Sequence, residues 1–95
     1  MEQQYVEHLI KLSNNIAKRE KEYLVARNNL EMLKASYILK NDWELTLGKS
    51  KVTQKEKDAY VQVELEEKIN EVNDLKLQVE YCKRIYEINV MSHKY

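Results

Sequence analysis

The chain of 95 residues contains no proline and a single glycine, Gly48. Proline and glycine are the residues that most often mark turns and the ends of helices and strands, so this chain has few turns. Charged residues make up 34% of the sequence, a composition typical of long helices with solvent-exposed faces. An all-β fold would need frequent turn signals, and they are missing. The sequence therefore predicts an all-α protein with one domain over residues 1–95.

Apolar residues recur at heptad spacing in both halves of the chain. A repeat of about 3.5 residues holds one face of a helix against a partner helix. The first half carries Leu9, Leu12, Ile16, Tyr23, Ala26, Leu30, Leu33 and Tyr37 at this spacing. The second half carries Leu65, Ile69, Val72, Leu75, Val79, Cys82 and Tyr86. We predict a first helix over about residues 2–46 and a second over about residues 54–93.

The segment between the two halves contains signals for the end of one helix and the start of the next. Gly48 favours the left-handed conformation that ends a helix, and Thr53 with Glu56 fits a capping box. Asn41 and Asp42 are weak helix formers that favour a kink before this end. A connection as short as residues 47–53 makes the two helices antiparallel neighbours. The predicted fold is an antiparallel two-helix coiled-coil hairpin.

The apolar residues outnumber those that one seam between two helices can bury. Exposure of several such side chains forgoes several kcal/mol, at about 25 cal/mol per Å² of apolar area. Self-association is the simplest way to cover them, and we predict a homodimer that forms a four-helix bundle. The alternative is that the second surface binds a different protein. The predicted interface consists of Leu24, Met32, Ile38, Tyr60, Val63, Leu77, Tyr81 and Ile88.

The turn region also combines one tryptophan with four lysines: Trp43, Lys49, Lys51, Lys55 and Lys57. Basic side chains around an exposed aromatic ring bind a nucleic-acid strand through phosphate contacts and base stacking. The same group is also suited to an acidic protein surface, where tryptophan is a frequent hot spot. A third interpretation is structural, with Trp43 packed against Val52 or Tyr60 to close the end of the hairpin. We favour the structural interpretation, and the two binding interpretations stay open.

No motif of a catalytic or metal site is present. His8, His93 and Cys82 lack the ligand spacing of known metal sites, and no phosphate-binding loop or nucleophile motif occurs. We therefore expect neither an enzyme nor a cofactor. Sixteen basic and sixteen acidic residues cancel, which is unlike a general nucleic-acid binder. With no signal-peptide pattern and no apolar run of membrane-spanning length, we predict a cytoplasmic protein that does not bind membranes.

The stretch from Gly48 to Glu67 resembles small helical-hairpin proteins encoded by bacteriophages of Gram-positive bacteria. In these proteins a polar turn leads to a second helix with a V-(T/A)-x-(R/K)-E-like start and an Ala/Tyr/Val cluster. The matching residues here are Val52, Thr53, Lys55, Glu56, Ala59, Tyr60 and Val61. The resemblance implies a phage accessory protein that acts in the host cytoplasm, expressed with replication or recombination genes or inhibiting a host protein.

The position of Trp43 near the turn is similar to that of the tryptophan in secreted WXG-type helical hairpins. This chain has Trp43-Glu44-Leu45 in place of Trp-x-Gly, and Gly48 follows three positions later. From these observations we predict a non-catalytic protein-interaction module that self-associates and binds or inhibits a host or phage protein. A nucleic-acid-binding accessory that uses the basic turn and a WXG-like secreted hairpin are the alternatives.

Overall fold

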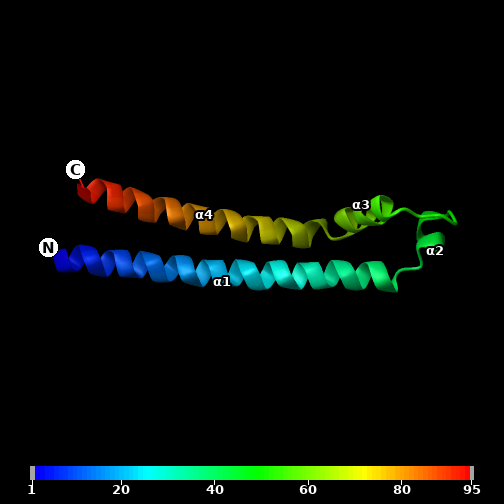
Figure 1. The fold of residues 1–95 in the computed structure, drawn as a ribbon, viewed down its shortest axis with the longest axis horizontal. Coiled ribbons are helices and arrows are strands. Elements are labelled where there is room, and N and C mark those ends of the chain that lie inside the picture. The colour runs from blue at the N-terminus through cyan, green and yellow to red at the C-terminus, as the bar shows by residue number, and fades with distance from the viewer. Residues whose placement is uncertain (1, 95) are drawn as a thin grey trace.

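The computed structural model describes residues 2–94, which form an elongated hairpin of helices measuring 69 × 20 × 17 Å. The helices are α1 (Glu2–Lys40), α2 (Trp43–Leu47), α3 (Gln54–Glu64) and α4 (Glu66–Lys94), and no strand occurs within this range. Figure 1 shows α1 running in one direction while α3 and α4 return alongside it. The predicted all-α fold is confirmed. Residues 1 and 95 of the predicted domain lie outside the described residues.

Side-chain contacts along the rod show that α1 and α4 are antiparallel. Near the open end, the Tyr5 ring stacks on the His93 ring at a centroid distance of 3.7 Å. Further along, Asn15 Nδ2 lies 3.4 Å from Cys82 Sγ, and the Lys83 ammonium lies 2.9 Å from a carboxylate oxygen of Glu20. Residues early in α1 therefore contact residues late in α4, as the predicted hairpin requires.

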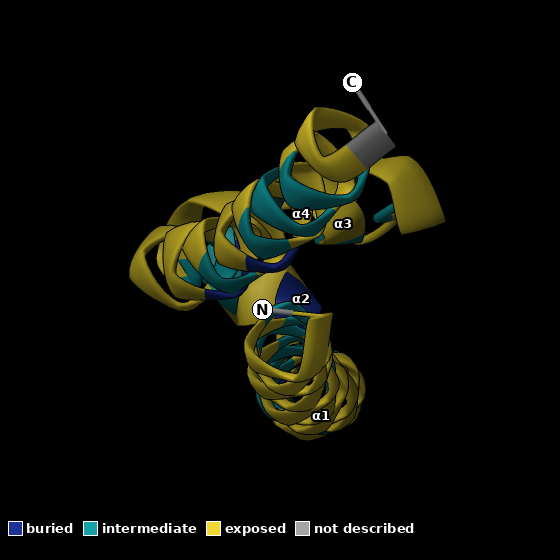
Figure 2. Ribbon diagram, turned by 90° about the vertical axis from the view of Figure 1, so that its left-hand side faces the viewer, coloured by how far each residue is buried: buried dark blue, intermediate teal, exposed yellow. Residues whose placement is uncertain are grey.

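The core is a single row of apolar side chains along the seam. Within the described residues, the buried apolar side chains are Leu30, Trp43, Val61, Val72 and Val79. Figure 2, viewed along the rod, shows buried segments where the helices face one another and exposed outer sides on both α1 and α4. Two helices that pack along one seam leave most of their circumference exposed, so stability depends on this one row.

The first predicted helix, over residues 2–46, is interrupted in the structure. α1 ends at Lys40, and Asn41 and Asp42 separate it from α2. The Asp42 carboxylate accepts a hydrogen bond from the Leu45 N–H at 3.2 Å, which makes Asp42 the N-cap of a new short helix. Aspartate and asparagine favour such local bonds over helix continuation, which explains the break.

The second predicted helix, over residues 54–93, is divided at Leu65. This residue has φ −105° and ψ 20°, outside the usual helical range, so α3 ends at Glu64 and α4 begins at Glu66. The Leu65 N–H still donates to the Val61 carbonyl oxygen, and the Ile69 N–H donates to the Leu65 carbonyl oxygen, both at 2.9 Å. Hydrogen bonding continues through the break, so α3 and α4 form one bent arm.

The two predicted capping signals are confirmed. Gly48 adopts the left-handed conformation, with φ 70°, and its N–H donates to the Glu44 carbonyl oxygen at 2.8 Å. A positive φ is easily adopted by glycine because it has no Cβ atom. At the start of α3, the Glu56 N–H donates to the Thr53 hydroxyl at 3.2 Å. Residues 48–53 therefore form the connection between α2 and α3.

We expect Leu30→Ala to lower the free energy of unfolding by about 2–4 kcal/mol, because it removes a buried leucine from the seam. Leu39→Ala is the matched control in the same helix, since the Leu39 side chain is 84% exposed and Leu30 is 7% exposed. The control is expected to unfold like the wild type. Urea denaturation followed by circular dichroism measures both, and equal losses would contradict the observed seam.

Candidate interaction surface

Trp43 is packed inside the end of the hairpin. Its side chain is 9% exposed, and its ring meets the Tyr60 ring edge-on at a centroid distance of 5.5 Å. The indole N–H donates to the Ile38 carbonyl oxygen at 2.8 Å, which satisfies one of the carbonyls at the end of α1. The interpretation in which Trp43 packs against Tyr60 is therefore correct. Trp43 is not available as an exposed contact for a base or a protein.

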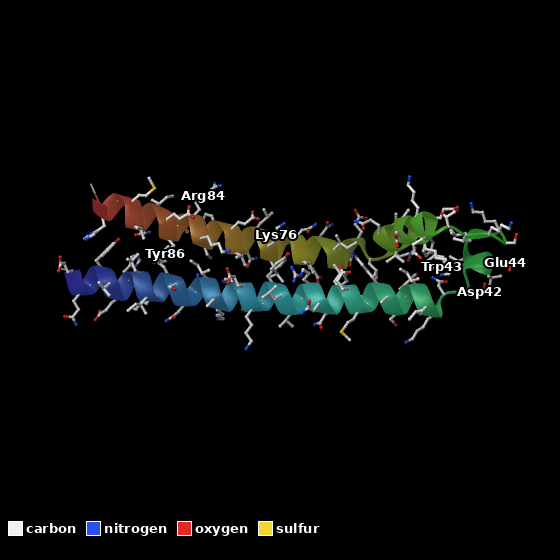
Figure 3. All side chains as sticks on the ribbon, in the orientation of Figure 1. Asp42, Trp43, Glu44, Lys76, Arg84 and Tyr86 are labelled. Carbon is white, nitrogen blue, oxygen red and sulfur yellow. The ribbon has the colours of Figure 1, made fainter. Side chains whose placement is uncertain are left out.

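Two of the four lysines of the turn region interact with other side chains of the hairpin. Lys49 forms an ion pair with Glu56, and the Lys57 ammonium lies 6.0 Å from the centre of the Trp43 ring. Lys51 and Lys55 are exposed. Four acidic residues lie between positions 42 and 58 and balance the four lysines in charge: Asp42, Glu44, Glu56 and Asp58. Figure 3 shows Asp42 and Glu44 beside Trp43 at this end of the rod.

Large apolar side chains are exposed over the whole length of the molecule. Of the predicted interface, six residues are exposed: Leu24, Met32, Val63, Leu77, Tyr81 and Ile88. Ile38 and Tyr60 are only partly exposed, and Tyr60 packs against Trp43, so these two belong to the hairpin's own packing. The other exposed large apolar residues are Val6, Ile10, Val25, Leu33, Leu39, Leu45 and Met91. Leu33 was predicted in the seam, but its side chain is 40% exposed. Met91 follows Ile88 by three residues, and this helical spacing was the signal that could have identified it.

The exposed apolar residues of α4 lie on one face of the helix, as two pairs separated by Arg84. Leu77, Tyr81, Ile88 and Met91, with Arg84 between them, follow one another at alternating spacings of four and three residues. At about 100° per residue, Leu77 lies about 140° around the helix from the buried Val72. We call the five residues Leu77, Tyr81, Arg84, Ile88 and Met91 the outer stripe. Figure 3 shows Arg84 on the side of α4 away from α1 and Tyr86 on the side toward it.

The exposed large apolar residues of α1 are more numerous than those of α4, but they are divided among several rows. Val6, Ile10 and Leu24 belong to one row, Val25, Met32 and Leu39 form another with a spacing of seven residues, and Leu33 lies apart from both. One large apolar residue per heptad provides half of what a helix–helix seam uses. The outer stripe of α4 is therefore the part of the surface most like an unpaired seam.

The hollows along the hairpin are shallow and carry no reactive cluster. One of about 230 Å³ lies between α1 and α4 and is lined by Tyr23, Leu24 and Val79 together with charged side chains. Over the described part of the chain, no group of three or more His, Cys, Asp or Glu residues is placed to hold a metal ion. His93 stacks on Tyr5, and Cys82 is half-buried in the seam.

None of the helices between residues 2 and 94 is both long and apolar enough to cross a membrane. Comparisons of the chain with protein-family models, with curated proteins and with solved structures found no match. The feature from which we infer a function is therefore the exposed apolar surface of the helices.

We expect Trp43→Ala to lower the free energy of unfolding by about 3 kcal/mol, because it removes a buried ring and leaves the Ile38 carbonyl without its donor. The control is Leu45→Ala, which truncates a neighbouring side chain that is 83% exposed. Thermal unfolding of both variants tests this. An unchanged melting temperature for the Trp43 variant would show that the ring does not hold the turn in place.

We expect part of the stability to be lost in acid through Glu56. Hydrogen bonding and ion pairing with Lys49 hold the pKa of the Glu56 carboxyl below its ordinary value of 4.5. A carboxyl with a lowered folded-state pKa stabilises the fold above its unfolded pKa, and this stabilisation is lost as pH falls through the folded-state pKa.

The comparison is between the wild type and Glu56→Gln, melted at pH values from about 6 down to about 3. The wild type is expected to lose more melting temperature over this range than the variant. Glu66→Gln, which changes an exposed glutamate of α4, is expected to follow the wild type. Identical acid sensitivity of the wild type and Glu56→Gln would mean that the Lys49–Glu56 pair adds nothing.

Proposed function

We propose that the protein is a non-catalytic protein-interaction module that associates with itself through the exposed apolar side chains of its long helices. The observation that carries this proposal is the outer stripe, where Leu77 is 61% exposed and Tyr81 is 66% exposed. Contiguous exposed apolar surface of this kind marks interaction sites on proteins. A symmetric homo-oligomer is the commonest way to cover such surface, and two hairpins joined in this way contain four long helical arms.

The energetics favour association. Each large apolar side chain that moves from water into an interface contributes about 1.5–3 kcal/mol when it becomes fully buried. The single seam of the hairpin buries only five apolar side chains among the described residues, so the isolated molecule has a small core. Burial of four more apolar residues of the outer stripe on each copy is large in comparison.

A second candidate function is the binding of a different protein near the turn. Met32, Leu39, Leu45 and Val63 are among the most exposed apolar side chains, and all belong to the half of the hairpin that contains α2 and α3. A phage accessory protein that binds a host protein would use such a surface. Its phage origin remains a prediction from sequence resemblance.

Binding of nucleic acid has less support. The ring that would stack on a base is buried, and the lysines around it are balanced by acidic residues. Phosphate binding weakens steeply as salt increases. Retardation of single-stranded DNA at low salt that disappears at high salt would favour this alternative, and we expect no retardation at either salt concentration.

We expect the purified protein to form oligomers larger than the 11.4 kDa chain at micromolar concentrations. Sedimentation velocity over a range of concentrations measures the mass and the dissociation constant. A hydrophobic dye is expected to bind more strongly at dilutions that separate the subunits, because these expose the apolar residues. A monomer of 11.4 kDa at all concentrations up to about 100 μM would refute self-association.

A further inference from the structure

We propose that the outer stripe of α4 binds the same stripe of a second copy in antiparallel orientation, with Leu77 against Ile88 of the partner subunit and Tyr81 against Arg84 of the partner subunit. This inference rests on the proposed self-association and identifies its interface. It is carried by the spacing, the exposure and the chemistry of the stripe.

The spacing of the stripe fits helix–helix packing. Its residues follow at steps of four, three, four and three, which is the repeat that keeps one face of a helix against a partner. Arg84 lies on the side of α4 away from α1 in Figure 3, and the four apolar residues of the stripe are 54% to 66% exposed. A second helix can therefore dock on α4 while α1 stays in place.

The part of the stripe from Leu77 to Ile88 is its own antiparallel complement, and Met91 falls opposite Asp74 of the partner subunit. Between Leu77 and Ile88 the steps are four, three and four, so the pattern is the same in both directions along the helix. A two-fold axis that passes between residues 82 and 83 brings Leu77 to the partner's Ile88 and Tyr81 to the partner's Arg84. By symmetry each of these two contacts occurs twice in the dimer. In an isologous interface every such contact occurs in both directions. The two outermost contacts are apolar, and the two inner contacts pair a cation with an aromatic ring.

Arg84 explains the choice of the antiparallel orientation. A guanidinium over an aromatic ring is attracted by the negative face of the ring, and the molecule already contains such a pair where Arg27 lies 5.6 Å from the centre of the Tyr23 ring. A parallel pair in the same register would instead place Arg84 against Arg84 of the partner subunit. Two unpaired cations in an apolar seam are strongly unfavourable. A single polar residue in an apolar seam commonly fixes its register in this way.

The charges beside the stripe agree with this arrangement. Glu80 and Glu87 are exposed next to the stripe, one on each side of Arg84 along the helix. Among the described residues, neither these two carboxylates nor Arg84 takes part in an ion pair within the hairpin. In an antiparallel helix pair, equivalent positions that flank the interface lie on the same side of that interface in both helices. The two arginines therefore lie among four glutamates and offset half of their negative charge.

The alternatives on α1 fit less well. The row of Val25, Met32 and Leu39 provides one large apolar residue per heptad, whereas the outer stripe has four among residues 77–91. The stripe covers 14 residue steps, or about 21 Å of helix, which makes a short interface. Such an interface is at the small end of the range for specific complexes, so we expect the association to be reversible.

The first test combines Leu77→Ser with Ile88→Ser and measures the dissociation constant by sedimentation equilibrium. We expect at least a hundredfold weaker association, because both apolar contacts are lost on each copy. The control combines Met32→Ser with Leu39→Ser, which removes two exposed apolar side chains from α1, and it is expected to associate like the wild type. Circular dichroism melts of the dilute monomers check that both variants remain folded.

The second test measures orientation with Cys82→Ser as the background, so that the only thiol is the introduced one. Leu77→Cys and Ile88→Cys proteins are treated with a short bis-maleimide, separately and mixed. The mixture is expected to cross-link in high yield. Each variant alone is expected to react poorly, because equivalent positions lie about 16 Å apart along the axis in the proposed pair.

The outcomes separate this inference from the general proposal. A monomeric wild type would overturn both. An oligomer that survives the Leu77 and Ile88 substitutions, or that is lost in the Met32 and Leu39 control, would leave self-association standing and overturn the assignment to α4. Efficient cross-linking of Leu77→Cys with itself would show a parallel pair and overturn the antiparallel arrangement.

Discussion

The seam between α1 and α4 is the interaction on which the rest of the molecule depends. It is one side chain deep, and its buried members Leu30, Val72 and Val79 lie along a rod 69 Å long. In a core of this shape, longer helices add length but no further layers of side chains. Each turn of helix is therefore held by the few seam contacts of its own residues. The same geometry leaves the outer sides of both helices exposed, which explains why this small hairpin exposes so much apolar surface.

At the closed end a different kind of packing takes over. Trp43, Tyr60 and Tyr37 form a chain of aromatic contacts, with the two tyrosine rings 6.3 Å apart. The short helix α2 exists because Asp42 caps it and Gly48 ends it, and its role is to carry Trp43 back over the end of α1. The residues that looked like a binding site in the sequence are thus largely a structural closure, and the unpaired surface lies along α4.

Much of this fold is predictable from the sequence because its determinants are local. Heptad spacing identifies the seam positions, and Gly48 and Thr53 identify the turn, since a cap depends on a few neighbouring residues. The break at Leu65 has no such signal, because the sequence around it is compatible with a continuous helix. The packing of Trp43 was favoured from the sequence, but its partner was not determined, since the contact with Tyr60 depends on the path of the chain between them. The exposure of Ile38 and Tyr60 was overpredicted for the same reason.

The contacts of the hairpin also differ widely in sequence separation. Trp43 and Tyr60 are close along the chain, whereas Tyr5 and His93 lie near opposite ends of it. Closing a short loop costs less conformational entropy than closing a long one, and each turn of seam that forms shortens the loop still to be closed. Loop-closure entropy therefore favours folding that begins at the aromatic closure and extends along the seam toward the end where Tyr5 and His93 meet.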